Sequence, residues 1–230
     1  MWIAIGLMVA MVAFLTAVAR LEKRMVWPYG NPEGQPQFSD TSGYSARWMA
    51  DALKAGFFLL GWAPDLKGPR YKVSYALMIS PQRDCFVAIG FGTVFNTPIA
   101  GTWVYTFAMD GRMFYSADNQ SCIETDVSRN WRSQLVKTFT FTGLLQRHRD
   151  LLKHRGVPIR AFTAGREIEE LKGLRKEHFQ LLLHQGLITF TDGSATHWRY
   201  TLRGALKRVV LDYSIGLLRA ITFGRIPRSF

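Results

Sequence analysis

The side chains best suited to metal binding or acid–base chemistry are five histidines, all of which lie beyond residue 147. His148 and His154 are six residues apart on one predicted helix, which separates them by about 240° around its axis, and His178 and His184 repeat that spacing. Two histidines placed in this way cannot share one metal ion, and no histidine pair at i, i+4 supplies a zinc template. The sequence therefore predicts no metal site and no cofactor.

The other reactive residues give no catalytic pattern. Cys85 and Cys122 are too few for a disulfide framework, and each is predicted to be a buried thiol, with a pairing between them left open. Gly90-Phe91-Gly92 lacks the third glycine of a dinucleotide fingerprint and predicts a bulge or a close strand contact. No nucleophile elbow or phosphate loop occurs, so no catalytic residue is predicted. The sequence leans towards a non-enzyme but leaves an enzyme open, because catalytic groups can converge from distant positions.

Basic side chains are the strongest functional signal. The formal net charge is +12. The excess of basic over acidic residues rises along the chain, from 0 over residues 1–40 to +3 over 41–140 and +9 over 141–230. Such a gradient favours an anionic partner, either phospholipid headgroups or nucleic acid. The residues expected to touch a membrane surface are Arg20, Lys23, Arg24, Arg219, Arg225 and Arg228.

The N-terminal segment is apolar. Residues 2–19 contain no charge and would form a helix about 27 Å long, close to the thickness of a hydrocarbon core. This pattern predicts an uncleaved single-pass membrane anchor over residues 1–25, with lipid as the partner of residues 2–19. The basic flank behind it places the C-terminal body in the cytoplasm. The alternative is a leader cleaved after Ala17-Val18-Ala19, in which case the body would be exported.

The remaining chain predicts an α+β fold in three parts. Residues 26–43 are rich in proline and glycine and predict a linker. Residues 44–140 predict a helix over 45–60 followed by a four-stranded antiparallel meander over 70–117, whose last turn is Asp110-Gly111. Residues 141–230 predict a basic, helical part with one hairpin. Its expected elements are helices over 143–154, 163–171, 174–185 and 202–220, a short strand over 157–162, and hairpin strands over 187–190 and 198–201.

Residues 143–201 resemble a winged-helix domain in the order helix, strand, helix, helix, hairpin, with Gly186-Leu187-Ile188 opening the wing and Asp192-Gly193 at its tip. The resemblance implies a recognition helix over 174–185. Its outward arc holds Lys176 and Gln180, which could contact phosphate and base edges, and the wing offers His197 and Arg199. Glu177 on the same arc opposes the approach of phosphate.

Together these features favour a membrane-anchored, non-enzymatic interaction or scaffold protein with a protein partner. One alternative is a membrane-tethered winged helix that binds nucleic acid. The other is an exported envelope protein or enzyme whose leader has been removed.

Overall fold

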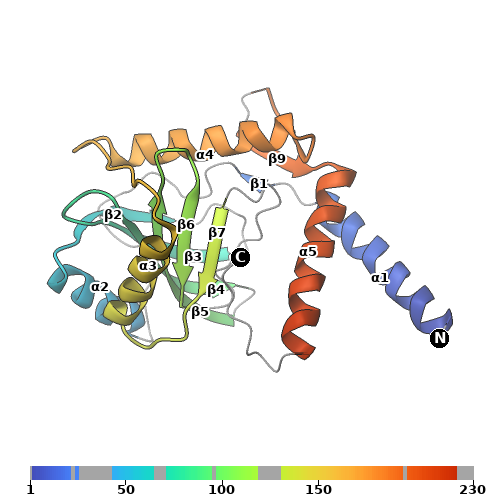
Figure 1. Cartoon of the computed structure of the whole chain (residues 1–230), viewed down its shortest axis with the longest axis horizontal. Helices are drawn as coiled ribbons and strands as arrows, with labels where there is room; N and C mark the ends of the chain where they lie inside the picture. The colour runs from blue at the N-terminus through green and yellow to red at the C-terminus, as the bar shows by residue number, and fades with distance from the viewer. Residues whose placement is uncertain are drawn as a thin grey trace. The chain divides into compact units, whose positions relative to one another are not determined.

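The computed structural model describes residues 2–21, 24–25, 43–64, 71–94, 97–118, 131–193 and 196–221. The fold is α+β and divides into two compact units, shown in Figure 1. Unit 1 comprises residues 1–27, 125–129 and 173–227, and unit 2 comprises residues 28–124, 130–172 and 228–230. The linker predicted over residues 26–43 lies outside the described residues, except for Gly43.

Unit 2 is built on a six-stranded sheet with the strand order β2-β3-β4-β5-β6-β7. All neighbours are antiparallel except β7, which runs parallel to β6. The predicted meander is present as β3 to β6, with an extra strand at each edge. The strands are β2 (Phe58–Pro64), β3 (Tyr71–Ile79), β4 (Phe86–Val94), β5 (Thr97–Phe107), β6 (Met113–Ala117) and β7 (Trp131–Leu135).

Two glycines of the meander have the roles that the sequence predicted. Gly111 adopts a positive φ of 80° in the turn between β5 and β6, and the Asp110 carboxylate accepts a hydrogen bond from the Arg112 backbone nitrogen at 3.1 Å. Gly92 has a φ of 148°, and a Cβ there would lie 2.0 Å from the Lys72 carbonyl oxygen. The predicted close strand contact is therefore confirmed at Gly92.

The helix expected over residues 45–60 ends early. Helix α2 (Tyr44–Lys54) is followed by Gly56 with a φ of 84°, and the chain then forms β2. The predicted helical end at Phe57–Leu60 is wrong, because a short apolar run has no period that separates a helix from a strand. Antiparallel pairing of β2 with β3 stabilises the extended conformation of this run.

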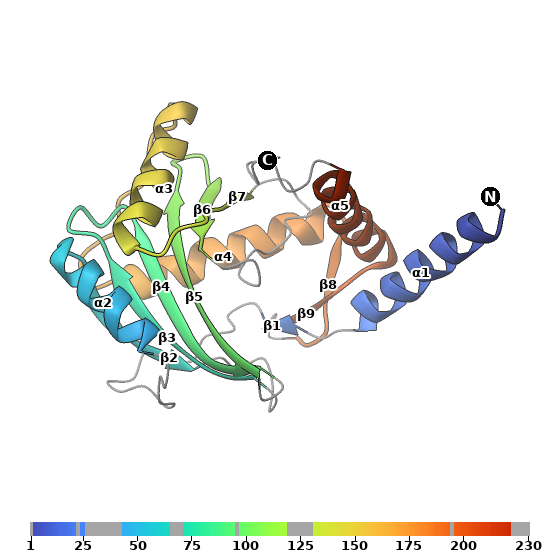
Figure 2. The ribbon, with the colours of Figure 1, turned by 90° about the horizontal axis from the view of Figure 1, so that it is seen from below.

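Helical residues pack on the two faces of the sheet to different extents. Helices α2 and α3 (Phe141–Arg155) pack on one face, as Figure 2 shows, where Phe141 is fully buried and contacts Trp48 and Phe57 edge-on. On the opposite face Ile168, near the start of α4 (Glu167–His184), packs against a second apolar cluster around Tyr75. Helices α2 and α3 thus cover one face of the sheet, and Ile168 contacts the apolar cluster on the other face.

Unit 1 combines α1 (Trp2–Leu21), the end of α4, α5 (Leu202–Ile221) and a three-stranded antiparallel sheet. The strand order is β1 (Arg24–Met25), β9 (His197–Tyr200), β8 (Ile188–Phe190). Helix α4 is continuous, so the predicted break at Gly173 is wrong; that glycine is exposed and needs no special conformation. The strand predicted over 157–162 is reduced to one bridge, between Ala108 and Ile159.

The predicted membrane anchor must be corrected. In the part of the chain that the structure describes, no helix has both the length and the apolar character needed to cross a membrane. The single-pass signal-anchor, and the membrane location with a cytoplasmic body that was inferred from it, are therefore wrong. Helix α1 packs against α5, and Ala19 joins the core of unit 1. An uncharged run is typical of a packed helix as well as of an anchor, which explains the error.

Candidate functional site

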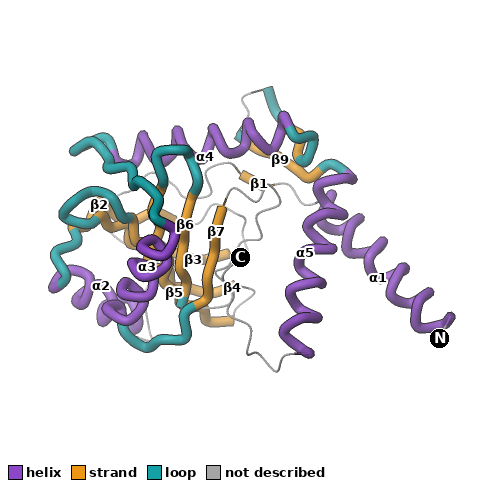
Figure 3. The backbone as a smooth tube through the Cα atoms, in the orientation of Figure 1, coloured by secondary structure: helices purple, strands orange, loops and turns teal. Residues whose placement is uncertain are grey.

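The candidate site is a groove of about 730 Å³ between α1 and α5 in unit 1. The two helices approach each other where α1 ends and α5 begins and diverge from that point, as Figure 3 shows. All lining residues but three are apolar. The lining consists of Met8, Val9, Val12, Ala13, Thr16, Ala17, Arg20, Leu21, Arg199, Leu202 and Leu206.

Strand pairing positions the first wall of the groove. Strand β1 follows α1 after a gap of two residues and pairs with β9, Arg24 opposite Trp198 and Met25 opposite His197. This pairing holds the end of α1 beside the start of α5. The groove therefore depends on a contact between segments that are more than 170 residues apart in the chain.

A tight helix start positions the second wall. The Thr201 hydroxyl donates to the Gly186 carbonyl at 2.7 Å and accepts from the Gly204 backbone nitrogen at 3.1 Å, which caps α5. A Cβ at Gly204 would lie 1.8 Å from the Leu187 carbonyl oxygen, so only glycine allows this approach. The first turns of α5 are fixed against the hairpin of β8 and β9.

The apolar walls are open to solvent. Val9 is 60% exposed, Met8 57%, Leu202 60% and Leu206 45%, whereas Thr16 at the floor is 5% exposed. The Thr16 hydroxyl donates to the Val12 carbonyl at 2.7 Å, so its proton is already hydrogen-bonded within the helix. Contiguous exposed apolar side chains of this kind are typical of interaction surfaces and ligand-binding grooves.

Two arginines flank the groove. Arg20 lies in the last turn of α1 and Arg199 on β9, and both side chains are exposed. The surrounding unit carries twelve basic and five acidic residues, a formal charge of +7. An occupant with an apolar face and a negative edge would satisfy both features.

Arg20 and Arg199 were predicted separately, one for a membrane surface and the other for nucleic acid, and the structure brings them to one groove. Arg24 is described only through its strand pairing. Lys23, Arg225, Arg228 and the side chain of Arg219 lie outside the described residues.

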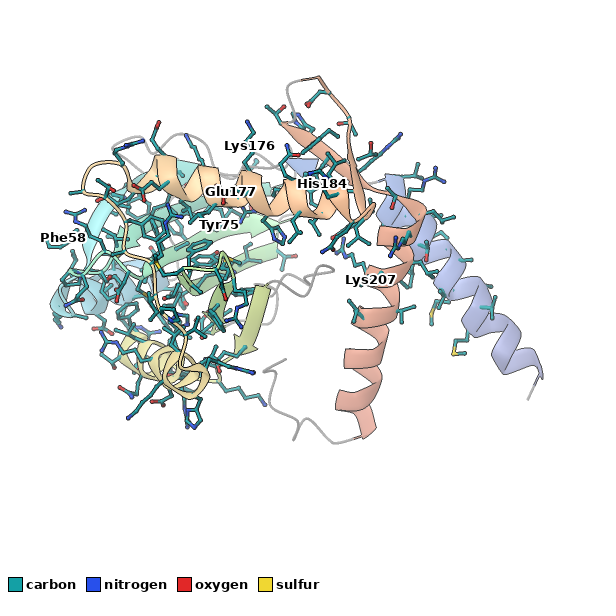
Figure 4. All side chains as sticks on the ribbon, turned by 45° about the horizontal axis from the view of Figure 1, so that its top comes forward. Phe58, Tyr75, Lys176, Glu177, His184 and Lys207 are labelled. Carbon is teal, nitrogen blue, oxygen red and sulfur yellow. The ribbon has the colours of Figure 1, made fainter. Side chains whose placement is uncertain are left out.

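The other predicted nucleic-acid contacts lie outside the groove lining. Lys176 is exposed on α4 beside the exposed Glu177, as Figure 4 shows, and Gln180 is half-buried. The Nδ1 of His197 lies 2.7 Å from an Asp192 carboxylate oxygen, to which the Thr196 hydroxyl also donates at 2.7 Å. The Thr196 hydroxyl, together with His197, holds the pKa of Asp192 below its usual range. His197 therefore closes the hairpin tip.

The apolar walls were not predicted from the sequence, because residues 2–19 were expected to lie in lipid. One signal was present in the last helix, where Leu202 and Leu206 are four residues apart and therefore share one face.

Comparison with known proteins adds no assignment: no protein-family model, no curated protein and no solved structure matches this chain. Among the described residues, no group of three or more His, Cys, Asp or Glu side chains is placed to hold a metal ion. The winged-helix resemblance stays a prediction. The structure assigns α3 to unit 2 and the hairpin of β8 and β9 to unit 1.

Proposed function

We propose that the chain is a non-enzymatic interaction protein whose groove between α1 and α5 binds an acidic amphipathic helix of a partner protein. The observation that carries this proposal is the exposed apolar lining of the groove, which is flanked by Arg20 and Arg199. Docking of the apolar face of a helix into a groove is a common mode of recognition. A third helix would cover the walls that α1 and α5 leave open.

The dimensions support an occupant of a few helical turns. The groove follows α1 from Met8 to Leu21, which corresponds to about 20 Å, or about thirteen residues of an α-helix. Anchoring residues of such a segment would recur at i, i+3, i+4 and i+7.

Charge argues against a second copy of this chain as the occupant. Symmetric pairing of two copies through this groove would bring two copies of the same basic surface, each with Arg20 and Arg199, into one interface. With a charge of +7 on unit 1, that contact is repulsive, whereas carboxylates along one edge of a partner helix would be attracted.

A designed peptide tests the apolar part of the proposal. The probe is a labelled sixteen-residue amphipathic helix with leucine on one face and glutamate on the other, and binding to the full chain is followed by fluorescence anisotropy. Val9→Asp places a charge in the groove and is expected to weaken binding by about tenfold or more. Met11→Asp is the matched control, because Met11 is exposed on α1 outside the groove lining. No binding by the wild type, or equal losses in the two variants, would overturn the proposal.

A charge reversal tests the electrostatic part. Arg199→Glu is expected to weaken binding of the glutamate peptide and to strengthen binding of the same peptide with lysine in place of glutamate. Lys176→Glu changes the net charge equally at an exposed position outside the groove and should leave both affinities unchanged. Equal responses to the two reversals would show that only net charge matters and would exclude the groove as the site.

The alternatives from the sequence stay predictions. Nucleic-acid binding requires Lys176→Glu to weaken binding of duplex DNA with a steep dependence on salt, but Lys176 lies beside Glu177 and His197 is engaged by Asp192. The cleaved-leader alternative requires a mature N-terminus beyond Ala19.

A further inference from the structure

Unit 2 contains a second hollow, which the groove does not explain. It lies between α3 and one face of the sheet, has a volume of about 360 Å³, and is independent of unit 1. Its lining comes from four regions: Phe57 just before β2, the turn between β3 and β4, Thr106 of β5, and α3 with the loop after it. This volume is near the lower end of the range for small-molecule sites, which is about 300–1,000 Å³.

The walls of this hollow are apolar. They comprise Phe57, Leu145, Leu152, Val157 and Ile159. A bound molecule must therefore present a compact hydrocarbon body.

The base of the hollow is polar but uncharged. The imidazole of His148 is 1% exposed, with Nδ1 2.9 Å from the Ser116 hydroxyl and Nε2 3.0 Å from the Thr106 hydroxyl. The Gln134 side-chain amide donates to the Ser116 hydroxyl at 2.7 Å. Because the Ser116 hydroxyl accepts from Gln134, its own proton is available for donation to Nδ1 of His148. The neutral imidazole then carries its proton on Nε2, which donates to the Thr106 hydroxyl. Both ring nitrogens are thereby used within the protein, so His148 positions Thr106 and is not a free base.

Burial keeps both titratable groups at the base neutral. Desolvation, with a smaller contribution from Arg149, lowers the pKa of His148 to about 3. Desolvation raises the pKa of Cys85, whose sulfur also lines the hollow, to about 12. A thiol of this kind is a poor nucleophile, which favours binding over covalent catalysis.

Charge is confined to groups at the outer side of the hollow. Arg149 and Lys153 line it from α3 and are exposed. Among the residues that line the hollow, Asp84 is the one acidic residue, and its carboxylate accepts a hydrogen bond from the Ser80 hydroxyl at 2.6 Å. Two cations against one partly satisfied carboxylate leave a net positive side.

We propose that this hollow binds a small monocarboxylate, with its hydrocarbon body among Phe57, Leu145 and Leu152 and its carboxylate at Arg149 and Lys153. The juxtaposition of an apolar wall with two exposed cations carries the inference. The limited volume favours a short aliphatic or single-ring carboxylate over a nucleotide or a two-chain lipid.

Octanoate is the probe, and isothermal titration calorimetry of the full chain is the measurement. Octanoate should bind about tenfold or more tightly than 1-octanol, which lacks the charge, and octylamine should bind more weakly than either. Equal affinity for octanoate and 1-octanol would overturn the proposal, as would failure of octanoate to bind.

Variants locate the binding. Arg149→Gln and Lys153→Gln should each weaken octanoate binding several-fold and leave 1-octanol unchanged. Arg155→Gln is the matched control, an exposed cation on the same helix outside the lining. An equal effect of Arg155→Gln would overturn the site.

The groove in unit 1 is itself apolar with two arginines, so its contribution must be separated. Val9→Asp should leave octanoate binding unchanged, and loss of binding in that variant would move the carboxylate site to the groove and refute this inference. Failure of the peptide experiment, in contrast, would leave the octanoate result standing, because the two sites lie in different units.

Discussion

Acidification should destabilise unit 2 through His148. The pKa of this imidazole is lowered from 6.5 to about 3 in the folded protein, chiefly by burial, so the unfolded chain binds a proton that the native state excludes. The contribution of His148 to the free energy of unfolding is therefore complete above about pH 6.5, and it is lost progressively as the pH decreases from 6.5 towards 3. The slope is about 1.4 kcal/mol per pH unit, which gives a loss of roughly 2 kcal/mol between pH 6.5 and 5.0. That loss is a large part of a total of about 5–15 kcal/mol.

Urea unfolding at pH 7.0, 6.0 and 5.0, followed by near-UV circular dichroism, measures this effect. The signal reports mainly on unit 2, which holds Trp48, Trp62, Trp103 and Trp131 of the seven tryptophans. The matched variant is His148→Gln, which retains a polar side chain but cannot titrate in this range. It should be less stable at pH 7.0, and its stability should change with pH by about 2 kcal/mol less than that of the wild type. If both proteins show the same dependence on pH, His148 is not held neutral and the reasoning fails.

Three further predictions concern packing and reactivity. Phe141→Ala should lower the free energy of unfolding of unit 2 by about 3–5 kcal/mol in urea, because a fully buried ring is lost. Gly204→Ala should lower the thermal stability of unit 1, since its Cβ would meet the Leu187 carbonyl; an unchanged melting profile would contradict the close approach. Cys85 should react with iodoacetamide at pH 8 about a hundredfold more slowly than a free cysteine, measured by peptide mass spectrometry, and urea should restore the rate.

The meander was predictable because its information is local. Residues 71–79 alternate with a period of two, and Asp110-Gly111 marks a hairpin, so neighbouring strands pair in sequence order. The edge strands were not predictable in this way. Strand β7 follows β6 after a long connection and pairs with it in parallel. No turn motif in the sequence predicts a parallel pairing of this kind.

The site was predictable only in part. The sequence singled out Arg20 and Arg199 as basic contacts, but nothing local places residue 20 beside residue 199, because their proximity depends on the pairing of β1 with β9. Helical geometry predicted His148 and His154 about 240° apart, and the structure buries the first and exposes the second; the burial of His148 was not predicted. The partners of His148 come from β5 and β6 and could not be read from its own helix.

The basic residues of the C-terminal part do not belong to a single unit. The excess of +9 over residues 141–230 is divided between the units, because α3 belongs to unit 2 and α5 to unit 1. A nucleic-acid interface would depend on many phosphate contacts and would lose affinity steeply with salt. The groove and the hollow each combine apolar walls with two flanking cations, so apolar burial would supply most of the affinity and the cations would select negative occupants. Binding at either place should therefore weaken only slightly between low and physiological salt, and a steep dependence would favour a polyanionic partner instead.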